Sequence, residues 1–240
     1  MKYLMGDFTI ISDRDYEKAI AVPESGIWDA RIQETEKLSS LRIMQDDTRV
    51  RSLLIPAFCI KERLKQMAQE IAGDYGPLKS LDLLVILTGS FILAADLGRE
   101  LYCHKLGPVV FHLAKVSTYS KEIKGSMELH RPVQIDLEPG ELKGRDIIII
   151  EDIIDQGFTL TRLKDFLLNE KQVNSLKLLC LLSKQLRNPS EDVRRLRADL
   201  TIDYTGFEVP DVWVAGYGID AGDEFRNLPC IISVKEECFR

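Results

Sequence analysis

The segment IIIIEDIIDQGFTLTRLKDFL, residues 147–167, holds the densest set of residues that could do chemistry. A β-branched apolar run ends in the adjacent acids Glu151 and Asp152, and Asp155 follows two apolar residues later. Carboxylates at such a position can accept hydrogen bonds from a diol, which a ribose supplies, or help to hold a hydrated Mg²⁺. The pattern therefore predicts a polar ligand site at the end of a strand.

The four residues that follow suit a phosphate. They run Gln156-Gly157-Phe158-Thr159, and a helical pattern comes next. Backbone N–H groups of a glycine-containing turn at a helix N-terminus can surround a phosphate, and the Thr159 hydroxyl can donate to it. The plain alternative is a capped strand–turn–helix with solvated acids. The complete E-D-I-I-D-x-G-x-T pattern after a β-branched run favours a binding site.

This segment closely resembles the phosphoribosyl-pyrophosphate (PRPP) binding motif of type I phosphoribosyltransferases, in the form typical of the hypoxanthine-guanine branch. The resemblance covers most of residues 50–235. LTGS at 87–90 is similar to the family's pyrophosphate loop, and SKQLRNP at 183–189 to the strand end that supplies a purine-binding lysine. DYTGFEVPDVWVAGYGIDAGDEFRNLP, at 203–229, matches a longer family motif almost throughout.

The resemblance implies a reaction in which a purine nitrogen displaces pyrophosphate from C1 of PRPP through an oxocarbenium-like transition state. Glu151 and Asp152 would then hold the ribose hydroxyls and contribute to the metal site. Asp155 would be the general base toward N7 of the purine, a role open to an ionisable carboxylate. The 5′-phosphate would lie against Gln156, Gly157, Phe158 and Thr159.

For the purine, the resemblance implies that Lys184 donates to the exocyclic O6, which selects 6-oxopurines over adenine. Trp213 would stack on the base, and the backbone at Val214 and Asp220 would meet its 2-position edge. The Asp220 side chain would also ligate Mg²⁺, the implied cofactor. The remaining family positions would bind pyrophosphate: Thr88, Gly89 and Arg226.

Residues 116–137 lie where the family has a flexible lid that closes over the site and excludes water. Thr118 and Tyr119 best fit the Ser-Tyr pair of that lid. An ordinary exposed loop is the alternative for this stretch.

Three residues depart from the family pattern. Gln156 stands where Thr is usual, and Phe158 where a polar residue is common. Thr88 replaces a Lys or Arg in a loop that often has a cis peptide bond. We expect weaker contacts to pyrophosphate or between subunits, but an active enzyme.

The elements around these residues alternate between strands and helices. A helix is predicted from Pro56 to Gly73, where an apolar face recurs at helical spacing. The further expected elements are strand 81–87, helix 91–103, strand 108–116, strand 146–150, a helix to about 170, and strands 175–182, 198–206 and 212–218. The central strands are apolar on both faces, which is typical of a parallel sheet covered by helices.

We therefore expect an α/β fold with a central, mostly parallel sheet flanked by helices, a small hood built from the two termini, and a lid loop. Ligands in such folds bind beyond the carboxyl ends of the strands. Residues 1–48 are expected to be an N-terminal extension packed on the core, with a weakly helical stretch at 33–44. The phosphoribosyltransferase domain would span 49–240, with its core at about 55–190 and its hood at about 191–235.

Composition sets further bounds. The chain has 240 residues, a net charge of −6 and no basic block, which argues against a protein that holds nucleic acid. Apolar runs are too short for a membrane helix, and no signal-peptide pattern is evident, so we expect a cytoplasmic protein without a membrane partner. Five scattered cysteines indicate neither disulfides nor a zinc site. The resemblance implies a homodimer or homotetramer.

The sequence leaves three functions to distinguish. The first is purine salvage, in which Mg²⁺-dependent transfer from PRPP converts hypoxanthine or guanine, with xanthine as a further candidate, into IMP or GMP and pyrophosphate. The second is a regulatory homologue that senses PRPP or nucleotides with little turnover, which the residues at 88, 156 and 158 favour. The third is an orotate or pyrimidine enzyme of the same fold, which Lys184 and Trp213 argue against.

Overall fold

The computed structural model of the chain describes residues 8–33, 42, 47–76, 80–104, 106–118, 133–137 and 142–239, with the backbone alone at 117, 118 and 133–137. Seven strands form the central sheet, in the spatial order β2-β10-β9-β8-β5-β6-β7. Their bounds are β2 Ile20–Ala21, β5 Leu81–Leu87, β6 Val109–Thr118, β7 Val133–Leu137, β8 Asp146–Ile154, β9 Ser175–Gln185 and β10 Tyr204–Pro210. All neighbouring pairs are parallel except β6 with β7, so the expected mostly parallel sheet is confirmed.

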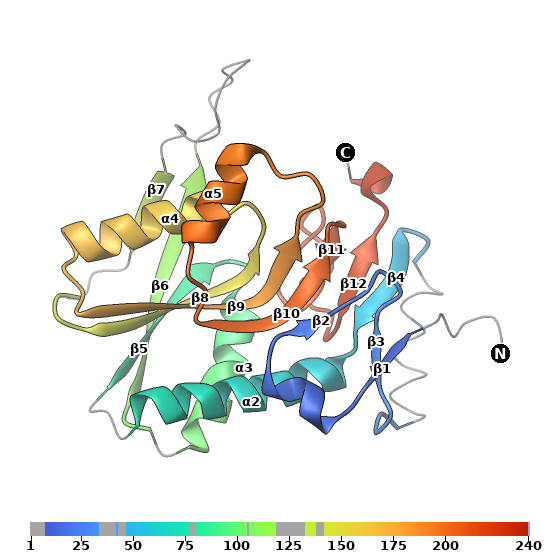
Figure 1. The fold of residues 1–240 in the computed structure, drawn as a ribbon, viewed down its shortest axis with the longest axis horizontal. Helices are drawn as coiled ribbons and strands as arrows, with labels where there is room; N and C mark the ends of the chain where they lie inside the picture. Colours follow the sequence, from blue (N-terminus) through green and yellow to red (C-terminus); the bar gives the residue numbers. More distant parts are fainter. Residues whose placement is uncertain are drawn as a thin grey trace.

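Helices cover both faces of this sheet. In Figure 1, α2 (Ala57–Tyr75) and α3 (Phe91–Tyr102) lie on one side, and α4 (Phe158–Asp165) and α5 (Glu191–Asp199) on the other. A π-helical turn, η3 (Phe166–Glu170), continues α4. None of the helices in the described ranges has the length and apolar content to cross a membrane.

Two apolar layers explain why the central strands are apolar without alternation. Along β8, Ile148 and Ile150 belong to the core layer beneath α2 and α3, whereas Ile147 and Ile149 belong to the layer beneath α4. Successive side chains of a strand point to opposite faces, so a strand buried on both faces carries apolar residues in succession instead of in alternation. The same alternation of layers occurs in β5 and β9.

The hood is a separate three-stranded sheet with the order β11-β12-β4. It combines β4 (Val50–Ile55), which precedes the core, with β11 (Val214–Ala215) and β12 (Ile231–Val234) near the C-terminus, and its pairs are antiparallel. A short 3₁₀ turn, η4 (Glu236–Cys238), follows β12. The predicted hood of terminal segments is thus present, and Figure 1 shows it beside the carboxyl ends of β8, β9 and β10.

The N-terminal segment packs into the same core as the central sheet. It contains β1 (Thr9–Ile11), the 3₁₀ helix η1 (Asp13–Glu17), β2 and β3 (Ile27–Asp29). β2 runs parallel to β10 at the edge of the central sheet, with Ile20 opposite Phe207. Most of the stretch 33–44 lies outside the described residues. The division of the chain at residue 48 stays a prediction.

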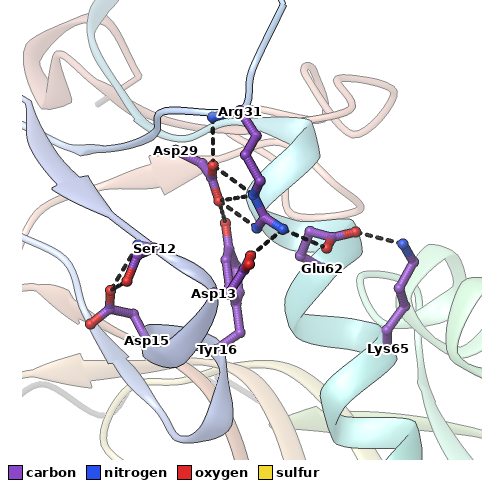
Figure 2. Close-up of polar contacts among 8 residues, drawn as sticks. All are labelled: Ser12, Asp13, Asp15, Tyr16, Asp29, Arg31, Glu62 and Lys65. Carbon is purple, nitrogen blue, oxygen red and sulfur yellow. Dashed lines mark hydrogen bonds and ion pairs between the residues drawn. The ribbon is translucent and has the colours of Figure 1, made fainter.

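Buried charges fasten this segment. The Arg63 guanidinium of α2 is buried and donates to the carbonyls of Tyr16, at 2.9 Å, and Thr205, at 2.8 Å, as well as to Glu70. Figure 2 shows a second cluster, in which the Tyr16 hydroxyl donates to Asp29 at 2.8 Å and Arg31 pairs with Asp29 at 2.7 Å. Burying such groups requires partners like these. The Arg63 bond to Tyr16 ties the segment to α2, and the second cluster joins parts of the segment to each other.

Several element boundaries differ from expectation. The strand predicted at 212–218 is found only at Val214–Ala215, as β11, and the strand predicted at 175–182 continues to Gln185. The helix predicted to stop at Gly73 continues to Tyr75 and is capped by Gly76. The strand predicted at 146–150 continues to Ile154, because its pairing with β9 extends past Glu151. The strand predicted at 198–206 is present but shifted, because α5 ends at Asp199 and β10 runs from Tyr204 to Pro210. Both α5 and β10 fall within 191–235, the range predicted for the hood. β10 instead belongs to the central sheet, and α5 is one of the helices that cover it.

Candidate active site

Glu151 and Asp152 lie within β8, near its carboxyl end. Oε2 of Glu151 is shielded from solvent and has no hydrogen-bond partner within the described residues. Burial, and then the charge of Asp152, raise the pKa of Glu151 well above its ordinary value. Burial also raises the pKa of Asp152 to about 6, although the Ile153 N–H donates to its Oδ1 at 2.8 Å. The desolvated carboxyls of Glu151 and Asp152 can thus gain partners from a polar ligand or a cation.

The turn between β8 and α4 has the geometry expected of a phosphate-binding loop. Gly157 precedes the helix with a φ of 91°, a left-handed conformation that favours glycine. No side chain caps the helix start at this residue. The first N–H groups of α4 therefore lack intrahelical partners and can receive an anion. Gln156, Phe158 and Thr159 are half-buried around this turn.

Asp155 and Lys184 come together from neighbouring strands. Asp155 follows the end of β8, and Lys184 lies one residue before the end of β9. Lys184 Nζ is 3.1 Å from Asp155 Oδ2 and 4.0 Å from Asp211 Oδ1. The lysine side chain is largely buried, whereas half of the Asp155 side chain is exposed. An open carboxylate beside a held ammonium can accept a proton from one group of a ligand while the lysine donates to another.

The loop of Thr88 and Gly89 joins β5 to α3, and the Leu87–Thr88 peptide bond is cis. A Cβ on Gly89 would lie 1.6 Å from Asp152 Oδ2, so only glycine fits against that acid. On the other side, a Cβ on Gly218 would lie 2.0 Å from the Gly89 carbonyl oxygen. The loop is therefore enclosed between the acidic strand end and the hood.

Asp220 and Arg226 complete this part of the site. Arg226 Nη2 lies 2.7 Å from Asp220 Oδ1, and its Nη1 donates to the Gly218 carbonyl at 2.8 Å. Both charges act on Asp152: Arg226 lowers its pKa and Asp220 raises it. Asp152, Gly89, Asp220 and Arg226 thus form one cluster although they come from three separate motifs.

Val214 is the first residue of the short hood strand β11, and Trp213 directly precedes it. Val214 is buried, and the Trp213 carbonyl accepts a hydrogen bond from the Val234 N–H at 2.9 Å. The Trp213 ring packs at 6.0 Å from the Phe239 ring, with an angle of 55° between them. The C-terminal Phe239 is therefore an aromatic neighbour that the motifs did not indicate.

The predicted lid is only partly visible. Thr118 is the last residue of β6, where only the backbone is described, and Tyr119 lies outside the described residues.

Sequence reasoning missed two polar residues beside this site. Asp211 lies near Lys184 and accepts a hydrogen bond from the Arg187 N–H at 3.2 Å. Its place in the quoted motif at 203–229 could have marked it. Arg197 lies on α5 and bonds to the ends of β8 and β9. It could not have been found, because α5 was not expected.

A parallel sheet with a strand-end acidic pair, a glycine turn before a helix and a glycine loop held by a hood defines the class of type I phosphoribosyltransferases. The family described as "Phosphoribosyl transferase domain" matches residues 59–221. The chain belongs to this family, and within it to the hypoxanthine-guanine phosphoribosyltransferases.

Relatives and solved structures agree on this branch. The hypoxanthine-guanine phosphoribosyltransferase of Dictyostelium discoideum is 35% identical over 75% of this chain and 93% of its own length. That of Aquifex aeolicus is 32% identical over 77% of this chain and 94% of its own. A hypoxanthine phosphoribosyltransferase structure from Staphylococcus aureus matches with a TM-score of 0.67, 30% identity and coverage of 82% of this chain and 97% of that one. The predictions of fold, family and enzyme class are confirmed.

Proposed function

We propose that this enzyme transfers the 5-phosphoribosyl group of PRPP to hypoxanthine or guanine, with xanthine as a further candidate base. The products are the 5′-mononucleotide and pyrophosphate. The observation that carries the proposal is the 3.1 Å contact between Asp155 and Lys184 at neighbouring strand ends. A 6-oxopurine offers an N7 proton and an O6 acceptor on one edge. A carboxylate and an ammonium placed side by side match that edge.

PRPP would occupy the space between the turn before α4 and the loop at Gly89. The ribose hydroxyls would donate to Glu151 and Asp152. Oε2 of Glu151, which has no partner in the described part of the chain, would then gain one. The 5′-phosphate would take the free N–H groups at the start of α4, within the segment Gln156–Thr159. Pyrophosphate would lie against the Thr88–Gly89 loop and Arg226, whose planar fork suits phosphate oxygens.

In the reaction itself, the protein positions the two substrates and accepts one proton. Asp155 takes the purine proton as C1 of the ribose is attacked, and the nearby carboxylates stabilise the positive charge that develops there. Lys184 donates to O6, which adenine cannot satisfy because its 6-amino group is a donor. Trp213 contributes a flat apolar face, and the backbone at Val214 and Asp220 meets the 2-position edge.

The residues present fit Mg²⁺. No cluster of three or more ligand-type side chains occurs in the described part of the chain. Mg²⁺, however, commonly binds through one or two carboxylates together with substrate phosphates and water. Asp152 and Asp220 interact electrostatically, and one oxygen of Glu151 has no partner among the described residues. We propose that these carboxylates hold the ion, which neutralises charge on the leaving pyrophosphate.

Thr118 and Tyr119 are proposed to belong to a lid that keeps water from the reacting carbon.

A homodimer or homotetramer is also proposed. Phe91, Tyr102 and Phe111 expose 46%, 87% and 44% of their surface and line one groove between α3 and β6, an apolar patch that a second copy could cover. A cytoplasmic site of action is proposed because Cys59, Cys103, Cys180, Cys230 and Cys238 are all free thiols.

A direct assay tests the proposal. The protein is mixed with PRPP, Mg²⁺ and, in turn, hypoxanthine, guanine, xanthine and adenine, and nucleotide formation is followed. Turnover with 6-oxopurines but not with adenine is expected, and omission of Mg²⁺ should abolish it. Absence of turnover with every base, together with measurable PRPP binding, would overturn the salvage function in favour of the sensing alternative.

A further inference from the structure

Helix α5 supports the two strand ends that carry Asp155 and Lys184. Its residue Arg197 is half-buried and reaches both strands. Nη1 donates to the Ile154 carbonyl at 3.2 Å, and Nη2 donates to Ser183 Oγ at 2.9 Å and to the Lys184 carbonyl at 3.2 Å. One guanidinium therefore bonds the residue before the proposed base and the proposed purine-binding lysine itself.

The position of this contact along the strands matters. The ladder between β8 and β9 ends at the pair Ile154 and Ser183, so regular strand pairing stops one residue before Asp155 and Lys184. Arg197 binds at this last pair and one residue beyond it. A planar guanidinium has five N–H donors in a fixed fork, which lets it serve two strands at once.

The same helix also packs against the turn proposed to bind phosphate. A Cβ placed on Gly157 would lie 2.9 Å from Leu196 Cδ2, 3.2 Å from Leu200 Cδ2 and 3.7 Å from Arg197 Cδ. The turn at Gly157 and the two strand ends thus rest on one surface of α5, the part of it around Arg197.

We propose that Arg197 is a positioning residue that fixes the separation of Asp155 and Lys184 and so sets recognition of the purine. This inference rests on the proposed function. Arg197 acts through its bonds to the backbone of β8 and β9. Removal of the Arg197 side chain should leave the Asp155 and Lys184 side chains themselves unchanged but let the distance between them vary.

The chain offers a matched control on the same helix. Arg194 is exposed and pairs with Glu191 at 3.5 Å, one turn earlier on α5. Exposed pairs of this kind contribute little to stability. Arg194→Ala removes the same charge as Arg197→Ala without touching either strand end.

Steady-state kinetics of the full chain with hypoxanthine and PRPP test the inference. For Arg197→Ala we expect a KM for hypoxanthine about tenfold higher and a several-fold lower kcat, because the base is bound and deprotonated in a looser site. The KM for PRPP should stay within threefold, since Leu196 and Leu200 still support the turn at Gly157. Arg197→Lys should recover part of the loss, because an ammonium can reach one strand end, and Arg194→Ala should match wild type.

Hydrogen exchange of the ligand-free protein provides a readout that is independent of turnover. Amides of residues 153–157 and 183–187 should exchange faster in Arg197→Ala and at the wild-type rate in Arg194→Ala. If Arg197→Ala does not fold, Ser183→Ala removes one of the bonds and should show the same changes to a smaller degree.

The outcomes separate the two proposals. Absence of turnover with every base in the wild-type protein would contradict the proposed function. Faster hydrogen exchange in Arg197→Ala would in that case still show that Arg197 holds the strand ends. An active wild type with unchanged kinetics and exchange in Arg197→Ala, or a uniform loss of thermal stability without any change in KM, overturns the positioning role alone.

Discussion

Lys184 and Asp155 form an ion pair at 3.1 Å across the ends of β9 and β8. The two groups proposed to meet the purine therefore satisfy each other in the free enzyme. Binding of a 6-oxopurine has to exchange this contact for one to O6 and one to the N7 proton. Asp211, at 4.0 Å, remains as a second carboxylate that can hold the lysine during the exchange.

Replacement of Asp155 by Asn should abolish most turnover and spare binding. A positioned general base contributes about 10²–10⁴-fold to rate, and the amide keeps the shape of the side chain. We expect kcat to fall by about that factor while the affinity for the product nucleotide, measured by calorimetry, changes only a few-fold. Asp165→Asn, on the exposed end of α4, is the control. An Asp155→Asn enzyme with more than a tenth of wild-type kcat would exclude Asp155 as the base.

Lys184→Ala should lose discrimination between hypoxanthine and adenine. A hydrogen bond to a charged group is worth about 1.5–3 kcal/mol, so kcat/KM for hypoxanthine should fall about 10–100-fold. The affinity for adenine, measured as competitive inhibition because adenine is not expected to turn over, should not fall in parallel. Lys177→Ala is a matched control, because Lys177 lies on the same strand and pairs with Asp74 at 2.6 Å, far from the carboxyl end. Equal losses with both bases would contradict the assignment.

Asp152 should make the free protein less stable as the pH rises. Burial raises the pKa of its carboxyl from 3.8 to about 6, so the folded state binds a proton that the unfolded chain has already released. The contribution of Asp152 to the free energy of unfolding therefore decreases between about pH 4 and pH 6. Asp152→Asn removes this penalty, and its Tm should exceed that of wild type by several degrees more at pH 7.5 than at pH 4.5.

The control for this effect is Glu170→Gln, an exposed residue. It should shift Tm little at either pH. The stabilised Asp152→Asn enzyme should bind PRPP more weakly than wild type. A Tm difference that is the same at both pH values would show that burial of this carboxyl does not destabilise the protein.

Thr88→Lys should improve the use of PRPP. Thr88 is exposed on the loop that approaches Asp152, so a longer side chain has room there. An ammonium beside the proposed pyrophosphate position adds a charge-assisted contact, and the KM for PRPP should fall several-fold with little change in the KM for hypoxanthine. Glu170→Lys serves as control. It also adds positive charge, but Glu170 precedes the first residue of β9 and so lies away from the carboxyl ends of the strands. A KM for PRPP that does not fall would place pyrophosphate away from this loop.

The sequence predicted the parts of the molecule in which local pattern and burial agree. β5 is found at 81–87 as expected, because six of its seven residues are apolar, as befits a strand covered on both faces. The acids of β8 and the turn at Gly157 were located for the same reason, since a strongly apolar run marks where the strand ends and polar residues begin. Lys184 and Asp155 meet because carboxyl ends of parallel neighbours lie on one edge of the sheet.

Long-range packing set what the sequence could not indicate. Helix α5 is mostly charged and buries only Val193 among its own residues, so its apolar period was too weak to predict it. Its start is instead fixed by Ser190, which accepts a hydrogen bond from the Val193 N–H. The contact of Trp213 with Phe239 joins the hood to the C-terminal end of the chain. No spacing within either segment indicates that contact.

The pairing of β2 with β10 bears on how the chain can be shortened. A variant that begins at residue 49 would leave β10 as an unprotected outer strand, with open N–H and C=O groups ready to pair with another molecule. It would also strip Arg63 of the Tyr16 carbonyl and leave part of a buried cation without an acceptor. Such a truncated protein should be prone to aggregation even though every residue of the proposed active site is retained.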